Sequence, residues 1–189
     1  MFFNISQPHL TAHTVSATTT VLAENKTWTI TGVSGPHSDA DKLLFLQVIT
    51  DLRTLCLPAW LVLGDFNLIL NVQEKNNACL NLPMINRFRS TIDNLELARI
   101  DLRGRKYTWC NDQQSPTMTR IDHFFASTDW LEWFPRTDLQ ALASLGSDHS
   151  ALFLQGDVSL DFIEVLDLSL TGRIDQVSWI PLKNHGSNR

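Results

Sequence analysis

The chain has 189 residues, of which 43% are hydrophobic and 19% charged, and its formal net charge is −5. This composition is typical of a globular domain that can bury a core, and it excludes a disordered polyelectrolyte. The acidic balance does not favour a nucleic-acid binder, which is more often basic. Residues 87–120 differ, because seven basic and four acidic side chains give this segment a net charge of 7 − 4 = +3.

The cysteine pattern and the apolar runs bear on location. Cys56, Cys79 and Cys110 have no C-x-x-C spacing, so we expect neither a disulfide framework nor a zinc site, and a reducing compartment fits best. No apolar run approaches the ~20 residues that span a bilayer, and the first residues lack the pattern of a secretory signal. The expectation is an intracellular protein, nuclear or cytoplasmic, with no membrane or secreted partner.

In chain order, the β-branched segments 9–17 and 27–34 predict two strands. A helix follows, capped by Ser38 or Asp39 and ended by Pro58. Its apolar residues at helical spacing are Leu43, Leu44, Leu46, Val48, Ile49 and Leu52. The sequence AWLVLGD (59–65) then predicts a strand that is apolar on both faces, which belongs in the middle of a sheet covered by helices.

The second half of the chain predicts further helices and paired strands. After a polar loop (71–81), Pro83 opens a helix whose apolar stripe is Ile85, Phe88, Ile92 and Leu95. Strands are predicted at 103–110 and 117–127, and a short helix capped by Thr128 or Asp129 follows them. Segments 139–145 and 150–155 predict two more strands. The order indicates an α/β fold with mixed sheets, in a domain of residues 1–155 with a divergent tail of 156–189.

A carboxylate and a carboxamide follow the central strand in the sequence GDFN (64–67). In an extended segment, Asp65 and Asn67 project to the same side while Phe66 faces the core. Such a pair suits phosphate esters, because the carboxylate accepts a proton from water and the carboxamide donates a hydrogen bond to a phosphoryl oxygen. The structural alternative is an Asx-capped turn at the end of a strand.

Two further strand ends carry polar side chains. GSDH (146–149) places Asp148 and His149 before an apolar strand, and Asp122 interrupts the apolar run RIDHFF. An acid within a strand costs free energy unless a partner such as histidine satisfies it. His123 is expected to point to the opposite face from His149. Three such strand ends predict a hydrolytic site at the edge of packed sheets.

The motifs WLVLGDFN, DLRGRKYTWCN, RIDHFFAS and LGSDHSALFL, in this order, resemble the endonuclease/exonuclease/phosphatase superfamily over residues 28–154. The resemblance is strongest to the endonuclease domain of plant non-LTR retrotransposons. It implies a four-layer α/β sandwich, in which two mixed β-sheets are flanked by helices, and Mg²⁺-dependent hydrolysis of phosphodiester bonds that nicks DNA.

The resemblance also implies a role for each matching residue. Asp65 would be the general base that activates water, and Asn67 would bind the scissile phosphate. His149 would stabilise the charged transition state, and Asp122 would hydrogen-bond its imidazole ring. Asp148 would lie at the Mg²⁺ site.

Other matching positions would bind the substrate. Trp109, Arg120 and the basic segment before Arg120 would face the DNA backbone, although a place in the core is an equal alternative for Trp109. The family's early Asn and its principal metal-ligating Glu have no counterpart before Trp28. Glu24 lies in a predicted hairpin turn and is expected to be solvated, and the family's active-site Tyr is Ser34.

These departures lead us to expect an N-terminally truncated domain that lacks the first strands of the family fold and leaves one sheet edge exposed. Activity is expected near background, because Mg²⁺ binding needs its carboxylates. One alternative is an inactive remnant that binds DNA weakly through residues 87–120. Another is a phosphatase of small phosphate esters, which the basic segment and the YTW sequence disfavour.

Overall fold

The computed structural model describes residues 3–21, 24–111, 113–142, 147–156, 162–164 and 180–181. Its helices are α1 (Asp39–Leu52), α2 (Leu82–Asn94) and α3 (Thr128–Trp133), with a 3-10 turn η1 (Val72–Glu74). Its longer strands are β1 (Phe3–Leu10), β2 (Thr14–Val21), β3 (Lys26–Ser34), β4 (Trp60–Asp65), β9 (Asp122–Ser127), β10 (Asp138–Ala141) and β11 (Leu152–Gln155). Its shorter strands are β5 (Leu97–Arg99), β6 (Leu102–Arg103), β7 (Trp109–Cys110), β8 (Met118–Thr119), β12 (Phe162–Glu164) and β13 (Ile180–Pro181).

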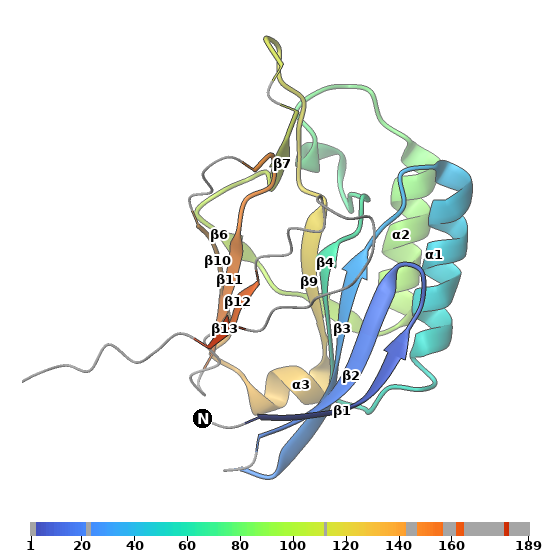
Figure 1. The fold of residues 1–189 in the computed structure, drawn as a ribbon. Helices are drawn as coiled ribbons and strands as arrows, with labels where there is room; N and C mark the ends of the chain where they lie inside the picture. Colours follow the sequence, from blue (N-terminus) through green and yellow to red (C-terminus); the bar gives the residue numbers. More distant parts are fainter. Residues whose placement is uncertain are drawn as a thin grey trace, which may run out of the picture.

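Two mixed sheets form the body of the molecule. The first has six strands in the order β1-β2-β3-β4-β9-β5, and the second has five in the order β13-β12-β11-β10-β6. Helices α1 and α2 lie side by side over one face of the six-stranded sheet, and the five-stranded sheet lies across its other face (Figure 1). The predicted α/β class with mixed sheets is confirmed. In the part of the chain that the structure describes, no helix covers the outer face of the five-stranded sheet, so three of the four expected layers are present there.

Strand β4 lies in the middle of the first sheet and is buried on both faces, as predicted. Trp60 and Val62 belong to the cluster beneath α1 and α2, whereas Leu61 and Leu63 belong to the cluster between the two sheets. This alternation explains why the sequence is a continuous apolar run rather than an alternating one.

Helix α1 begins where the sequence predicts, because the Ser38 side chain accepts a hydrogen bond from the Asp41 amide at 3.2 Å. Its buried residues are Phe45, Leu46, Ile49 and Leu52. Leu43 and Leu44, which belong to the predicted apolar stripe, are 48% and 68% exposed. The true stripe therefore passes through Phe45, and the prediction is wrong in adding Leu43 and Leu44.

Helix α2 is also confirmed, and its first residue, Leu82, lies one position before the predicted start at Pro83. The Asn81 side chain accepts from the Met84 amide, and Pro83 lies in the first turn. The predicted residues Ile85, Phe88, Ile92 and Leu95 are all buried. For the described residues, no helix is long and apolar enough to cross a membrane.

The predicted strand at 9–17 is wrong, because a hairpin turn divides it into β1 and β2. The Thr11 hydroxyl accepts hydrogen bonds from the backbone amides of His13 and Thr14, and this side-chain turn replaces the ladder there. The following prediction, 27–34, is confirmed as β3. Glu24 is exposed beside Lys26, with which it forms an ion pair at 2.8 Å, as expected of a hairpin residue.

Two predictions in the second half need correction. The predicted strand 117–127 is two strands, β8 and β9, because the Arg120 and Ile121 amides donate to Glu74 and Thr108 instead of to a ladder. Helix α3 is capped by Ser127, whose hydroxyl accepts from the Trp130 amide, and not by Thr128 or Asp129.

The last predicted strands correspond to β10 and β11, which pair antiparallel, although residues 143–146 lie outside the described residues. Most of the proposed tail, 156–189, also lies outside them. Of its strands, β12 pairs with β11 and β13 pairs with β12.

Candidate active site

Strands β4 and β9 bring two carboxylates together at one end of the six-stranded sheet. In their antiparallel register, Asp65 pairs directly with Asp122, and on the other side Asp65 pairs with Ser34 of β3. Like charges directly opposite each other destabilise a sheet, so this pair is costly without a compensating cation. Such a cost at strand ends is typical of a functional site.

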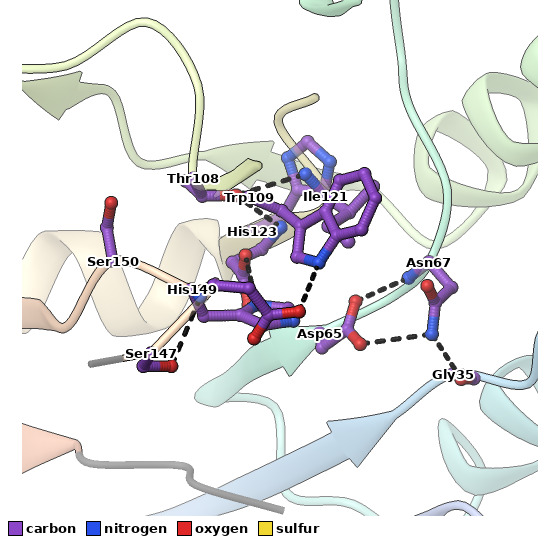
Figure 2. Close-up of polar contacts among 12 residues, drawn as sticks. Gly35, Asp65, Asn67, Thr108, Trp109, Ile121, His123, Ser147, His149 and Ser150 are labelled. Carbon is purple, nitrogen blue, oxygen red and sulfur yellow. Dashed lines mark hydrogen bonds and ion pairs between the residues drawn. The ribbon is translucent and has the colours of Figure 1, made fainter. Parts of the chain in front are cut away.

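Asp65 and Asn67 form a closed turn, which Figure 2 shows beside Gly35. The Asn67 amide donates to Asp65 Oδ1 at 2.8 Å, and Asn67 Nδ2 donates to Asp65 Oδ2 at 3.0 Å and to the Gly35 carbonyl at 2.7 Å. Asn67 has φ 51°, in the left-handed region that asparagine tolerates better than most residues. The two side chains lie together as predicted, within the Asx turn that was the structural alternative.

Two glycines allow the end of β3 to lie against this turn. A Cβ on Gly64, which has φ 131°, would be 2.3 Å from the Val33 carbonyl oxygen. A Cβ on Gly35 would be 2.2 Å from the Phe66 carbonyl oxygen. Neither position admits a side chain, so the backbone contact that orients Asp65 depends on both glycines.

His149 lies against Asp122, as the sequence predicts. Its Nδ1 is 3.2 Å from both carboxylate oxygens of Asp122. The buried Thr108 supports both residues, because its hydroxyl accepts from the Asp122 amide at 3.1 Å and its carbonyl accepts from the Ser150 amide at 2.7 Å. Sequence reasoning missed Thr108, although its place in the YTW motif was a signal.

Trp109 is half-buried and combines both expected roles, because its ring packs against the buried cluster of Ile69, Ile85 and Ile121 while its indole N–H lies at the site. Its Nε1 donates to Asp148 Oδ2 at 2.8 Å, and the Cys110 amide donates to the Asp148 carbonyl at 3.0 Å. Trp109 also forms a bridge with His149, so the loop before β11 is fixed along β7 (Figure 2). Asp148 is exposed beside His149.

The charged side chains of the site shift the pKa values of Asp65 and His149. Burial and then the charge of Asp122 raise the pKa of Asp65 to about 7, although the Asn67 amide, His149 and Lys42 act to lower it. Burial acts to lower the pKa of His149, but the hydrogen bond and charge of Asp122 and the charges of Asp65 and Asp148 outweigh it and raise the pKa to about 9. At neutral pH, a cationic imidazole therefore lies beside a carboxyl group that can exchange a proton.

Arg120 does not lie with these residues. It is 8% exposed, its amide donates to the Glu74 carbonyl, and its Nε and Nη2 have no hydrogen-bond partner. Its guanidinium faces inward, where burial and then the charge of Arg99 lower its pKa. The buried Glu74, which sequence reasoning missed, pairs with Arg99 and accepts from the Leu70 amide, so it holds the chain that follows Asn67.

His123 points away from His149, as predicted, and is fully buried. Its Nε2–H donates to the Leu68 carbonyl at 3.0 Å, and its ring packs among Phe66, Phe88 and Phe125. Burial lowers the pKa of His123 to about 4, so the ring is neutral. It anchors the segment after Asn67 rather than taking part in the site.

A metal ion needs more donors than the described residues bring together. Within them, no three His, Cys, Asp or Glu side chains are grouped so that they could hold an ion. Asp65 accepts twice from Asn67, Asp122 pairs with His149, and Asp148 accepts from Trp109. These residues do not fit a complete Mg²⁺ site, which needs near-octahedral oxygen ligands.

The fold and the strand-end groups define a phosphoesterase-like α/β sandwich, and sequence comparison shows its family. A sequence model of the Endonuclease/Exonuclease/phosphatase family matches residues 5–149, and the chain belongs to this family. Among proteins with curated descriptions, none matches this chain in sequence.

Solved structures share the fold at low identity. The endonuclease domain of TRAS1, a telomere-specific non-LTR retrotransposon, is similar with a TM-score of 0.59 and 16% identity, over 73% of this chain and 60% of that one. An endonuclease/exonuclease/phosphatase family protein from Bacteroides thetaiotaomicron has a TM-score of 0.55 and 14% identity, over 78% of this chain and 63% of that one. The chain thus spans about three fifths of the length of these structures.

Proposed function

We propose that the chain hydrolyses phosphodiester bonds in DNA, as a nicking endonuclease of the non-LTR retrotransposon type. The observation that carries the proposal is the pairing of Asp65 with Asp122 across two strands, with His149 held by Asp122. This arrangement would supply a proton acceptor, Asp65, and a cation, His149, that Asp122 holds in place. The likeness to the TRAS1 endonuclease domain supports the nuclease reading over a small-ester phosphatase.

The chemistry follows from the protonation states of the two groups. Asp65, with its pKa near neutrality, takes a proton from the attacking water, which is efficient when the pKa lies near the working pH. The imidazolium of His149 stabilises the negative charge that develops on the phosphoryl oxygens. Asp122 positions His149, and Asn67 orients Asp65. Both N–H groups of the Asn67 carboxamide are donated to Asp65 and Gly35, so binding of a phosphoryl oxygen by Asn67 would replace one of these two bonds.

The nuclease reading also depends on charge beside the site. A hollow of about 560 Å³ next to His149 is lined by Arg105 and Lys106 as well as by Trp109. Cations along a groove bind a nucleic-acid backbone without regard to sequence, and an aromatic ring can stack on a base. We propose that Trp109 contacts the DNA there, and that the part assigned to Arg120 falls to Arg105 and Lys106.

We expect the reaction to be Mg²⁺-dependent and slow. If Mg²⁺ were held near Asp148, it would supply polarisation of the phosphate and stabilisation of the leaving oxygen. Asp148 is the proposed ligand, but the described residues bring no second or third carboxylate to it. One missing electrostatic contribution in such a site typically costs ~10²–10³ in rate.

Nicking of supercoiled plasmid by the purified chain, with Mg²⁺ and with EDTA, tests the proposal. We expect slow nicking that requires Mg²⁺ and is lost in Asp65→Ala and in His149→Ala. His9→Ala is the matched control, because His9 is exposed on β1. Equal nicking by all variants would contradict the proposal and indicate a contaminating nuclease.

The second candidate is an inactive member of the family that retains DNA binding. The incomplete set of metal ligands among the described residues favours it. Plasmid that stays supercoiled with the unchanged chain, together with a salt-sensitive shift of labelled DNA, would support this candidate over the first.

A further inference from the structure

A second cleft, of about 290 Å³, opens on the other side of Trp109. Asn67 and Trp109 both line it, together with Lys42 and Lys75. Trp109 also lines the hollow that contains His149. Asn67 lines one hollow, His149 lines the other, and Trp109 lines both, as expected if an extended substrate crossed the site.

Lys42 brings a positive charge close to the reacting groups. Its side chain is only 16% exposed, and its Nζ lies 3.9 Å from Asp39 Oδ1, at the outer limit of an ion pair. The other Asp39 oxygen accepts from Asn81 Nδ2 at 2.7 Å, which holds this carboxylate toward α2. Lys42 also acts to lower the pKa of Asp65, so its charge is felt at the catalytic end of the cleft.

Lys75, in the segment between β4 and α2, supplies a second ammonium group. Its Nζ donates to the Cys79 carbonyl at 2.8 Å, which fixes the side chain along the wall of the cleft. An ammonium group has three N–H donors, and this contact uses one of them. Leu68, Ile69 and Ile85 form an apolar part of the lining. The Asp39 carboxylate, which contacts Lys42 and Asn81, lines the cleft as well.

This combination fits an anion that carries an apolar or weakly polar body. Asp65 and Asp122 repel a polyanion at the reaction centre, so a phosphate next to the scissile one needs its own cations. In one cleft, two ammonium groups provide charge for a phosphate, and apolar side chains provide contact for a sugar. A small phosphate ester bound at Asp65 would leave this cleft unused.

We propose that Lys42 and Lys75 form a subsite for the phosphate that neighbours the scissile phosphate, so that the substrate is a polynucleotide strand rather than a small phosphate ester. The assignment of the neighbouring phosphate rests on the proposed function, but the binding of a polynucleotide by these lysines can be measured without hydrolysis.

The test is the salt dependence of binding of a fluorescein-labelled octathymidylate, followed by fluorescence anisotropy in EDTA between 25 and 200 mM KCl. Each phosphate that a protein neutralises on a single strand contributes about 0.7 to the magnitude of the slope of log K against log[salt]. We expect Lys42→Gln/Lys75→Gln to reduce this magnitude by about 0.7, because the subsite neutralises one phosphate and both of its ammonium groups are removed. Lys42→Arg/Lys75→Arg keeps both charges and should keep the slope.

Lys26→Gln is the control for removal of a positive charge away from the cleft, because Lys26 begins β3 and so lies at the opposite end of that strand from Ser34 and the catalytic turn. Thermal unfolding of each variant checks that it is folded. A slope in Lys42→Gln/Lys75→Gln equal to that of Lys26→Gln would overturn the subsite, as would an unchanged chain that does not bind the octathymidylate.

The two proposals fail separately. A reduced slope without any plasmid nicking would support the subsite and contradict the proposed hydrolysis. Nicking with an unchanged slope would support the hydrolysis and overturn the subsite.

Discussion

The environments of Asp65 and His149 raise the pKa values of both side chains, but for different reasons. Asp65 is disfavoured as an anion by burial and by Asp122, whereas His149 is favoured as a cation by three surrounding carboxylates despite its burial. Side chains whose pKa values are strongly shifted by burial and by specific charged neighbours are typical of acid–base sites.

Replacing Asp122 with Asn should lower the pKa of His149. The substitution keeps the size of the side chain but removes the hydrogen-bonding carboxylate and its charge, which are the main influences that raise this pKa to about 9. NMR titration of the His149 ring protons in EDTA measures the change, with His9 as an internal reference. A pKa that stays near 9 in Asp122→Asn would contradict the assigned ion pair.

Asp65→Asn should make the chain more stable at neutral pH. Because the folded pKa of Asp65 is about 7 and the unfolded value about 3.8, the native state binds more protons between these values. Stability of the unchanged chain therefore falls as pH rises from about 4 to about 7, by on the order of a few kcal/mol.

Asp65→Asn removes that dependence. Urea denaturation at pH 4 and at pH 7 should show similar stabilities for the two chains at pH 4 and the variant more stable at pH 7. A variant that is less stable at pH 7 would show that the Asp65 carboxylate stabilises the turn more than its desolvation costs.

The sequence predicted which polar side chains come together at the candidate site, but not the residues that hold them in place. Asp65, Asn67, Asp122 and His149 follow apolar strands or interrupt them, and such patterns are visible in one dimension. Thr108 bonds the amide of Asp122, which is distant in sequence, and only its place in the YTW motif pointed to it. Glu74 bonds the nearby Leu70 amide, but its burial and its pairing with Arg99 depend on packing that the sequence does not display. Arg120 is a polar residue whose burial depends on packing, which the sequence does not display.

At the scale of elements, the junction between β3 and β4 depends on Gly64. We expect Gly64→Ala to destabilise the chain by at least about 3 kcal/mol, because a Cβ there meets the Val33 carbonyl at 2.3 Å and the positive φ is strained. Gly32→Ala is the matched control in β3, where the nearest atom is 4.0 Å away, and should cost less than about 1 kcal/mol. Equal midpoints in urea for the two variants would contradict the close approach.

Ser127 joins α3 to the centre of the first sheet. Its hydroxyl accepts from the Trp130 amide and also from the Trp60 amide at 2.9 Å. We expect Ser127→Ala to cost about 2 kcal/mol, because it removes a cap and leaves a buried N–H without an acceptor. Thr128→Ala, at an exposed position, should stay within about 0.5 kcal/mol by thermal unfolding. The reverse order would restore Thr128 as the cap.

Elements were predictable where one strong signal dominated. The apolar run of β4 and the places of helices α1 and α2 agree with their predictions, although the buried stripe of α1 includes Phe45 and not Leu43 and Leu44. The hairpin at Thr11 was missed because threonine favours strands by propensity and can also form a turn with its own hydroxyl. The break between β8 and β9 depends on bonds to Glu74 and Thr108, which are contacts between distant segments.

At the scale of the whole molecule, two mixed sheets pack so that the ends of β3, β4 and β9 and the loop before β11 meet at one place. Family motifs in order along the chain predicted this meeting, since a fold is a fixed relation between such segments. The composition did not, because the overall charge of −5 conceals the cations of the two hollows beside Trp109.

The most direct test of the central claim is the pH profile of plasmid nicking by the unchanged chain and by Asp122→Asn. If Asp65 accepts the proton and cationic His149 stabilises the charge, the rate rises with pH up to about 7 and falls above about 9. Asp122 raises both pKa values, so both limbs should move to lower pH in Asp122→Asn. Limbs that stay in place in the variant would contradict the roles assigned to Asp65 and His149.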